Sequence, residues 1–305
     1  MAKSTSPPLR MHHVADSVPG RPRLSVLSWN TLADGLAQNG NFSRVAPEAL
    51  AWPHRLPLLL EEIYRHDADI VSLQEVNRFE AFSEALGAHG YVGAFSAKAY
   101  SACSSLGFPV DGVALFYRQA RFKPLLAPQT GVFVAPDGTN LSQSWLSILL
   151  LDKQAQKPLL VATTHLKAKD NWEEMRLAEA RQLSELLRVQ LMAAGCAPPP
   201  ALLVCGDFNA SLEAPCCQQL TASLGLVPTA RSVPPLAAFS TWKYRTTEAG
   251  ELEKCCVIDH MWHCPQLRHT ATRAQPTKEE CGEGGLPNLS YPSDHLAQLN
   301  VFEWH

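Results

Sequence analysis

Short apolar runs alternate with amphipathic stretches along most of this chain. The runs are rich in Val, Ile and Leu, and many of them end in a polar residue. Alternation of such runs with helical patterns is typical of an α/β fold. The short stretch 152–157 links two of the runs as a hairpin, so we expect sheets that are not purely parallel. The predicted strands are 23–29, 69–75, 112–118, 144–152, 158–165, 201–207, 257–262 and 297–304.

Two longer segments have the periodicity of helices. Apolar residues recur every three to four positions over about 54–66 and again over 171–192. Asn171 is a favourable N-cap for the second helix, and Glu173 and Glu174 complement the positive end of its dipole.

The length and composition favour a single folded domain. The chain has 305 residues, of which 46% are hydrophobic and 18% charged, so it can bury a large core. It contains no internal repeat and no charge run, and the segments 226–238 and 274–290 are predicted to be long loops. We therefore expect one domain over 23–305, preceded by a flexible arm over 1–22.

The opening segment does not indicate secretion. It lacks the apolar core of a signal peptide, and no apolar stretch in the chain reaches the roughly 18 residues that a membrane helix needs. The first 23 residues carry four basic residues and one acidic residue, but their prolines and histidines make a poor amphipathic helix. We expect a cytoplasmic monomer, with a mitochondrial presequence as the alternative.

Cysteines and net charge exclude further classes. The nine cysteines lie mostly in apolar surroundings or in adjacent pairs, which predicts reduced thiols. A zinc site drawn from Cys255, Cys256, Cys264 and Cys281 is a weak alternative, because the chain has no C-x-x-C pair. The net charge of −3 and the pI near 6.4 argue against a broad nucleic-acid-binding face.

Polar residues lie at or next to the ends of six of the predicted strands. They are Asn30, Glu75, His165, Asp207 with Asn209, Asp259, and Asp294 with His295. Any one of them is explained by the capping of a turn. Six together favour a ligand site, because loops at one edge of an α/β sheet are where such sites form.

The chemistry of this set is coherent. Carboxylate and amide oxygens, with no thiolate, suit a hard divalent cation such as magnesium. Two histidines among carboxylates suit proton transfer and the stabilisation of developing phosphoryl charge.

The motifs SWN, LQEV, THLKA, CGDFN, IDHMW and YPSDH occur in this order over residues 28–295. Together they resemble those of the endonuclease/exonuclease/phosphatase superfamily. The linking segments PEALAWPHR, DGVALFYR, TTHLKAKDNWEEMR and STWKYRT resemble one branch of it more than the related deadenylases of the carbon catabolite repression group. The resemblance implies a DNase I-like four-layer α/β sandwich, in which two mixed β-sheets pack face to face between flanking helices. It also implies a magnesium-dependent site for phosphate ester hydrolysis at one edge, with manganese as a substitute.

The same resemblance assigns roles to the polar strand ends. It implies that Glu75 is the main metal ligand and that Asn30 lies beside it. Asp207 would orient the attacking water and help to deprotonate it, and Asn209 would hold the transferring phosphoryl group.

The remaining polar residues would act on the phosphoryl group. His295 would stabilise or protonate it, with Asp259 bonded to the imidazole to fix the tautomer. Asp294 would support metal or water nearby, and His165 would donate to a non-bridging phosphate oxygen.

The branch resemblance points to the 2′-phosphate of NADP and NADPH as the scissile group. Such a dinucleotide brings about four negative charges into a small volume, which calls for a compact set of cations. The residues that match are Lys98, Lys167, Lys169 and Arg245. Lys169 stands where that branch usually has an arginine, so we expect looser phosphate binding from a point charge than from a planar fork.

Three other functions remain as alternatives. A poly(A)-specific 3′ exoribonuclease would need aromatic platforms for stacked bases, and the residues available are Trp172, Trp242, Tyr244 and Phe208. An inactive binding module would need a missing ligand or acid, whereas every matched position holds a competent residue. General DNA cleavage would need a basic face that the composition lacks.

Overall fold

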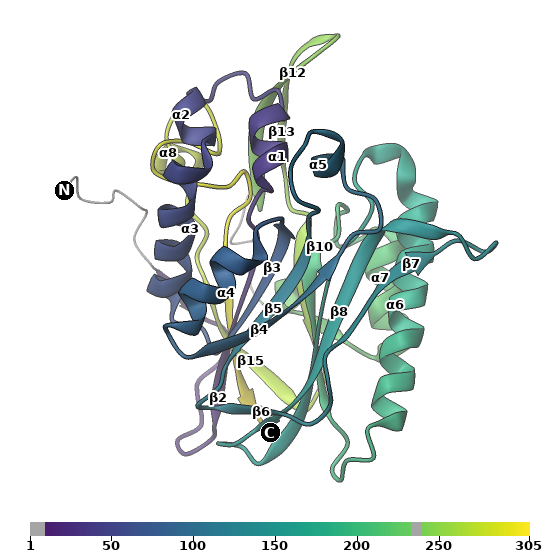
Figure 1. The fold of residues 1–305 in the computed structure, drawn as a ribbon. Helices are drawn as coiled ribbons and strands as arrows, with labels where there is room; N and C mark the ends of the chain where they lie inside the picture. The colour runs from purple at the N-terminus through teal and green to yellow at the C-terminus, as the bar shows by residue number, and fades with distance from the viewer. Residues whose placement is uncertain (1–9, 233–238) are drawn as a thin grey trace.

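The computed structural model describes residues 10–232 and 239–305, and it is built on two large mixed sheets (Figure 1). The first sheet has the order β1-β15-β16-β2-β3-β5-β4, with bounds Met11–His13, Leu267–Arg273, Gln298–Trp304, Arg23–Asn30, Ile70–Val76, Gly112–Arg118 and Tyr91–Ala97. The second has the order β11-β14-β10-β9-β8-β6, with bounds Val227–Pro228, Asp259–His263, Ala201–Asp207, Lys157–His165, Asn140–Asp152 and Phe122–Pro124. β7 (Gln129–Val134) also pairs with β8, and β12 (Thr241–Thr247) forms a separate hairpin with β13 (Gly250–Cys256).

Helices cover the outer faces of both sheets. α3 (Trp52–His66) and α4 (Phe79–Gly87) lie over the first sheet, and α6 (Glu173–Ala193) and α7 (Pro215–Leu224) lie over the second (Figure 1). The shorter helices are α1 (Asp34–Asn39), α2 (Pro47–Leu50), α5 (Ala102–Ser105) and α8 (Lys278–Cys281), with 3₁₀ turns η1 (Asp170–Trp172) and η2 (Thr229–Ser232). The predicted four-layer α/β sandwich is confirmed. No helix in the described part of the chain is long and apolar enough to cross a membrane.

The alternation of side chains along each strand builds two apolar layers. On β2, Leu24 and Val26 belong to the core between the sheets, whereas Leu27 and Trp29 pack outward in a cluster that includes Leu59 of α3. A strand that is buried on both faces consists mostly of apolar residues, so the apolar runs in the sequence predicted these strands.

The core between the sheets becomes polar close to one edge. Ser72 of β3 donates a hydrogen bond to Thr163 Oγ1 of β9 at 2.8 Å, across the interface between the sheets. Gln74 Nε2 bonds both of these hydroxyls, at 3.0 and 3.1 Å, and Ser28 of β2 at 3.4 Å. Ser28 and Thr163 each lie two residues before a predicted site residue, on the same face of their strands.

Strand and helix positions agree with the sequence patterns to within a few residues. β5 and β10 have the predicted bounds, and β8 and β9 form the predicted hairpin. The predicted N-cap Asn171 is wrong. Asn171 lies in η1, and α6 begins at Glu173 after Trp172, which makes no side-chain capping bond.

Three segments differ from the loops and arm that the sequence indicated. Residues 11–13 form β1 and pair with β15, so part of the expected arm is held on the first sheet. The loop predicted at 274–290 contains α8, whose N-terminus has a complete capping box between Thr277 and Glu280. The loop predicted at 226–238 contains β11 and η2, and its last six residues, 233–238, lie outside the described residues.

Gly206 allows β9 and β10 to approach each other directly below the polar edge. A Cβ atom at this position would lie 2.1 Å from the backbone oxygen of Thr164, far inside van der Waals contact. The parallel pairing of Asp207 with His165 depends on this close approach.

We predict that Gly206→Ala lowers the free energy of unfolding by about 3 kcal/mol, because neither backbone can move without breaking the ladder. Urea unfolding would measure the loss. The control is Gly87→Ala at the end of α4, where an added Cβ would meet nothing within 4 Å. A loss at Gly206 no larger than that at Gly87 would contradict the interpretation.

Candidate active site

Four strands end at the same edge of the sandwich, and each brings a polar residue there. β2 and β3 run parallel in the first sheet, and β9 and β10 run parallel in the second. Their carboxyl ends carry Asn30, Glu75, His165 and Asp207. β14 and β16 run antiparallel to β10 and β2, so their amino ends bring Asp259 and His295 to this same edge.

Asp207 is the centre of the cluster. Asn30 Nδ2 donates to Asp207 Oδ2 at 3.0 Å, which links the two sheets, and the backbone N–H of Asn209 donates to Oδ1 at 2.9 Å. His165 Nε2 and His295 Nε2 lie 3.6 and 3.8 Å from Oδ2. The carboxylate is buried and meets two imidazoles that reach it from different sheets.

Glu75 reaches the edge because β3 has a bulge there. Gln74 pairs with Val113 and Val76 with Gly112, so Glu75 is the extra residue, and its φ is +55°. The bulge lets Val76 take the next position in the outer apolar cluster. Left-handed backbone costs about 1–3 kcal/mol at a non-glycine residue, and such strain is concentrated at functional sites.

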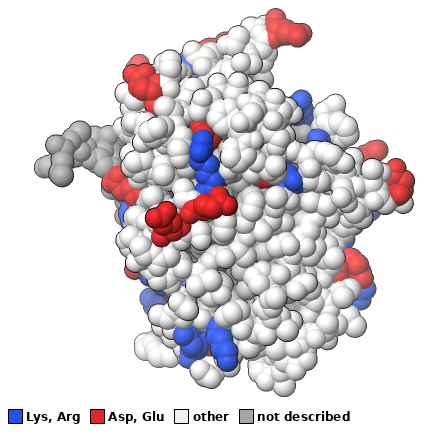
Figure 2. All heavy atoms as spheres, in the orientation of Figure 1, with Lys and Arg blue, Asp and Glu red and all other residues white. Residues whose placement is uncertain are grey.

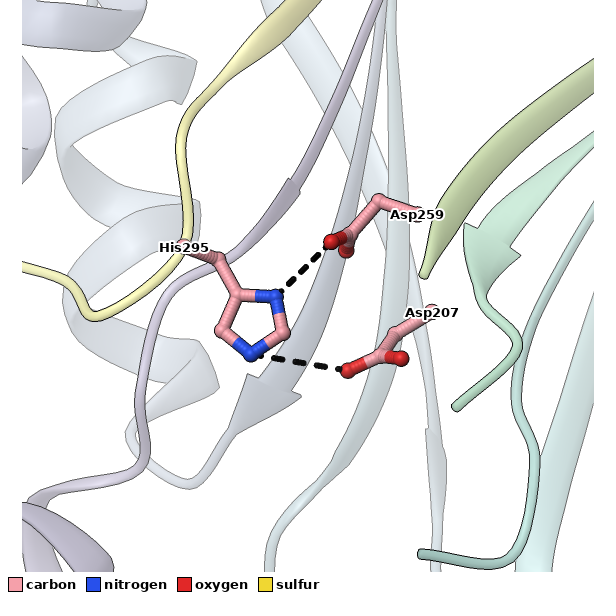
Figure 3. Close-up of side chains that lie close together, drawn as sticks. All are labelled: Asp207, Asp259 and His295. Atoms are coloured by element: carbon pink, nitrogen blue, oxygen red, sulfur yellow. Dashed lines mark hydrogen bonds and ion pairs between the residues drawn. The ribbon is translucent and has the colours of Figure 1, made fainter. Parts of the chain in front are cut away.

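His295 forms a buried chain with Asp259 and Ser240, and Figure 3 shows how its ring lies between Asp259 and Asp207. Its Nδ1 lies 2.9 Å from Asp259 Oδ2, and the Ser240 hydroxyl donates to the same oxygen at 2.6 Å. Asp259 therefore fixes the orientation of the imidazole and directs Nε2 toward Asp207.

The two histidines have opposite electrostatic environments. Burial lowers the pKa of His295, but the carboxylates of Asp259 and Asp207 outweigh it and raise that pKa to about 9. Burial and the nearby Lys98 lower the pKa of His165. Burial raises the pKa of Asp207, but the two histidines together with the hydrogen bonds from Asn30 and the Asn209 backbone bring it below its usual value. At neutral pH the site thus holds an anionic Asp207, a protonated His295 and a neutral His165.

Asn209 bonds both His165 and the backbone next to it. Its Nδ2 donates to the backbone oxygen of Leu166 at 3.0 Å and lies 2.9 Å from His165 Nε2. A carbonyl oxygen can only accept, so this orientation of the amide makes Nε2 an acceptor and places the proton of neutral His165 on Nδ1. Both amide hydrogens of Asn209 are used within the protein, and Nδ1 of His165 is buried without a partner.

The residues that could hold a metal ion form two sets. Asp207, Asp259 and His295 have ligand atoms within 4.8 Å of one another, the only such group among the described residues. A His295 that is protonated at both nitrogens has no lone pair to offer, so this group fits a proton network better. Glu75 and the Asn30 amide oxygen fit a hard cation, since they supply oxygen ligands without a thiolate. The cysteines proposed for zinc do not enter the group.

Asp294 is tied to cations rather than to Asp207. It accepts a hydrogen bond from Lys243 Nζ, and Arg245 Nη2 lies 3.6 Å from the same oxygen. Burial raises the pKa of Asp294, but Lys243, His295 and Arg245 hold it well below its usual range. Lys243 and Arg245 lie two residues apart on one face of β12, which continues the site beyond the sheets.

The other predicted cations come from separate segments. Lys98 follows β4 and forms an ion pair with Asp111 at 2.6 Å, close enough to His165 to lower its pKa. Lys167 and Lys169 lie in the segment that follows β9 directly after His165. Lys167 Nζ lies 5.2 Å from the centre of the Trp172 ring, and Lys169 is exposed.

Three residues at this edge were missed by the sequence analysis. Lys243 had a signal, because it alternates with Arg245 on one strand. Ser240 and Arg55 had none. Arg55 is fully buried in α3 and donates to the backbone oxygens of Thr31 and Pro292, so it holds together the segments that carry Asn30 and His295.

Comparison with known proteins agrees with this geometry. The model of the endonuclease/exonuclease/phosphatase family matches residues 27–295. Nocturnin of Xenopus laevis is 33% identical over 98% of this chain and 78% of its own length. Carbon catabolite repressor protein 4 homolog 2 of Arabidopsis thaliana is 30% identical over 61% of this chain and 35% of its own length. The branch indicated by the linking segments is therefore confirmed as nocturnin.

A solved structure shows the same fold. The human nocturnin catalytic domain with bound sulfate anion superimposes on this structure with a TM-score of 0.74, at 28% sequence identity and with 97% of each chain covered. The predicted DNase I-like architecture is confirmed.

We predict that Asp259→Asn lowers the pKa of His295, because one of the two charges that stabilise the imidazolium is lost. In the unaltered protein His295 is protonated below a pH of about 9 and loses its proton as the pH rises through that value. NMR titration of the imidazole in metal-free protein would measure the shift. Asp137→Asn, an exposed substitution, is the control. An unchanged midpoint in Asp259→Asn would refute the assigned pairing.

Proposed function

Since the chain belongs to the endonuclease/exonuclease/phosphatase family, and is thereby a metal-dependent phosphoester hydrolase, we propose that it removes the 2′-phosphate of NADP(H). The products are NAD(H) and inorganic phosphate, and the metal is Mg²⁺. The observation that carries the proposal is the set of cations around a catalytic cluster in an otherwise acidic protein. Lys98, Lys167 and Arg245 come from three separate segments: Lys98 acts electrostatically on His165, Lys167 follows His165 by two residues, and Arg245 pairs with Asp294, the residue before His295.

The cations next to the cluster are few, which favours a dinucleotide over a long RNA. The net charge is −3 and the pI near 6.4, and Figure 2 shows acidic and basic side chains scattered over the visible face without a broad basic surface. Binding along an RNA backbone needs an extended positive track, because phosphate contacts supply most of its affinity.

The aromatic residues also support the smaller substrate. Phe208 and Trp242 are buried, so their faces are not available to stack on bases. Tyr244 is half-buried, and the Arg44 guanidinium covers its ring at 3.7 Å. Trp172, 38% exposed, is the one of the four candidates that remains accessible. One platform suffices for a dinucleotide, whereas a poly(A) tail needs several in succession.

The chemistry follows from the protonation states at the edge. A metal ion at Glu75 and Asn30 would neutralise charge on the phosphoryl group and lower the pKa of bound water. Anionic Asp207 accepts a hydrogen bond from the attacking water and aligns it with the phosphorus atom. His295 donates its Nε2 proton toward an oxygen of the group in transfer, while Asp259 retains the imidazolium. Neutral His165 lies beside Asp207 and Asn209, and we assign it to a non-bridging oxygen of the same group.

Among the matched cations, Lys169 is expected to contribute the least selectivity for the 2′-phosphate. A lysine offers one strongly hydrated charge, whereas an arginine would grip two phosphate oxygens at once. We therefore propose that this chain binds the 2′-phosphate through electrostatic attraction more than through a fixed bidentate geometry.

We predict that NADPH is a better substrate than adenylated RNA. Purified protein with Mg²⁺ is expected to release phosphate from NADPH with a specificity constant far above that for release of AMP from an RNA with a 3′ adenosine tail. Separate assays of phosphate and AMP would measure both. A higher specificity constant for the RNA would assign the protein to the deadenylases instead.

Substitutions in the site are expected to separate catalysis from substrate binding. Asp207→Ala and His295→Ala are expected to abolish turnover, because each removes a group that acts in the transition state. Lys167→Ala is expected to raise KM about tenfold with little change in kcat, since it binds ground and transition states alike. An unchanged KM would show that Lys167 is only a surface charge.

We predict that Mg²⁺ binding depends on the charge of Glu75. Calorimetric titration is expected to detect Mg²⁺ binding in the parent protein and to lose it in Glu75→Gln, which keeps the shape of the side chain but removes its charge. Glu84→Gln, an exposed position on α4, is the matched control. Equal Mg²⁺ affinity in the two variants would place the metal elsewhere.

A further inference from the structure

Two buried ionisable residues of α6 lie outside the catalytic cluster. Their side chains bond the backbone of the segment that carries Lys167 and Lys169. Arg176 is 4% exposed and Glu179 is fully buried. They are three residues apart, so they lie on the same face of the helix. This face is turned toward residues 166–170, which connect His165 to the start of the helix.

Both side chains are bonded to the backbone of that segment. Arg176 Nη1 donates to the backbone oxygens of Lys167 and Lys169, at 3.1 and 2.6 Å. Glu179 Oε2 accepts the backbone N–H of Lys167 at 2.8 Å. Lys167 is therefore held at its N–H and at its C=O by two residues of one helix.

The segment needs such support because its backbone is strained. Lys169 has φ +79° and ψ 148°, a conformation that L-residues rarely adopt. Its carbonyl oxygen takes the shortest of the Arg176 bonds. Without that bond the chain would relax toward ordinary backbone angles, and the direction of the Lys169 side chain would change with it.

Stability alone does not account for the buried charge of Arg176 or for Glu179, whose pKa burial raises to about 7. Taking an ion out of water costs several kcal/mol, and well-packed apolar residues often replace buried charges without loss of stability. Arg176 also bonds Glu173 at 3.0 Å, but that carboxylate is 38% exposed and compensates it only in part. One oxygen of Glu179 is buried without any partner. Both side chains instead bond the backbone of the segment that carries Lys167 and Lys169.

We propose that Arg176 and Glu179 are positioning residues, which clamp the backbone of 167–169 so that both lysines present their amino groups to a polyanionic substrate. The proposal rests on the proposed function for the identity of that substrate. It assigns the clamp to binding, and not to the chemical step, because neither residue contacts Asp207 or the histidines.

The test is a double-mutant cycle with NADPH. Arg176→Ala is expected to raise KM about tenfold and to leave kcat within about threefold, with Mg²⁺ affinity unchanged. In a Lys167→Ala, Lys169→Ala background the same substitution is expected to change KM less than about twofold, because its effect passes through those lysines. An equal effect in both backgrounds, or a fall in kcat alone, would overturn the proposal.

Glu179 supplies a second variant with a matched pair. Glu179→Ala removes the acceptor for the Lys167 N–H and is expected to behave as Arg176→Ala does. Glu179→Gln retains an oxygen at that place and is expected to restore KM to near the parent value. Arg188→Ala is the control on the same helix, since Arg188 is exposed and its side chain bonds Glu185 and Met192, away from residues 167–169. Failure of Glu179→Gln to restore KM would contradict the backbone contact.

Hydrogen exchange separates this proposal from the proposed function. The amide of Lys167 is expected to exchange faster in Glu179→Ala than in Glu179→Gln, whichever substrate the enzyme uses. If NADPH is not hydrolysed by the parent protein, the proposed function fails, and the clamp is decided by this exchange rate alone. Equal exchange in the two variants would refute it.

Discussion

The hydrogen bond from Asn30 to Asp207 is the contact on which the site depends. Each sheet by itself supplies only half of the cluster, with Glu75 in one and His165 in the other. The bond fixes the oxygen of Asp207 that both histidines face, and it joins the two sheets where their strands end. The surrounding elements serve to keep this contact short: Gly206 lets β9 and β10 approach, and Arg55 holds the loops that follow and precede the strands.

The protonation states at this edge follow from the charged groups that surround each buried histidine. Two imidazoles at similar distances from one carboxylate take opposite protonation states, because burial and Lys98 dominate at His165, whereas the carboxylates of Asp259 and Asp207 outweigh burial at His295. The neighbourhood sets the role of each histidine. One can donate a proton on the side of Asp207, and the other remains neutral beside Asn209.

The sequence predicted the strands and their polar ends because both signals are local. A strand that is buried on both faces reads as an apolar run, and a polar residue at its end is visible against that background. Asn171 failed as an N-cap because the chain adds a 3₁₀ turn first, which propensity does not reveal. Arg176 and Glu179 were not found because charged residues on a helix resemble a solvated face until the opposing backbone is known. The short strand β1 has no apolar signal, since its three residues are exposed.

The buried polar side chains between the sheets determine how precisely the catalytic groups are aligned. Hydrophobic burial is non-directional, so two apolar sheets in contact have no strongly preferred offset along their strands. The bond between Ser72 and Thr163 selects one offset, two residues below the catalytic groups. A slip of a single residue would move the sheets by about 3.3 Å and separate Asn30 from Asp207. The alignment of the reacting groups is thus set by hydroxyls that no substrate reaches.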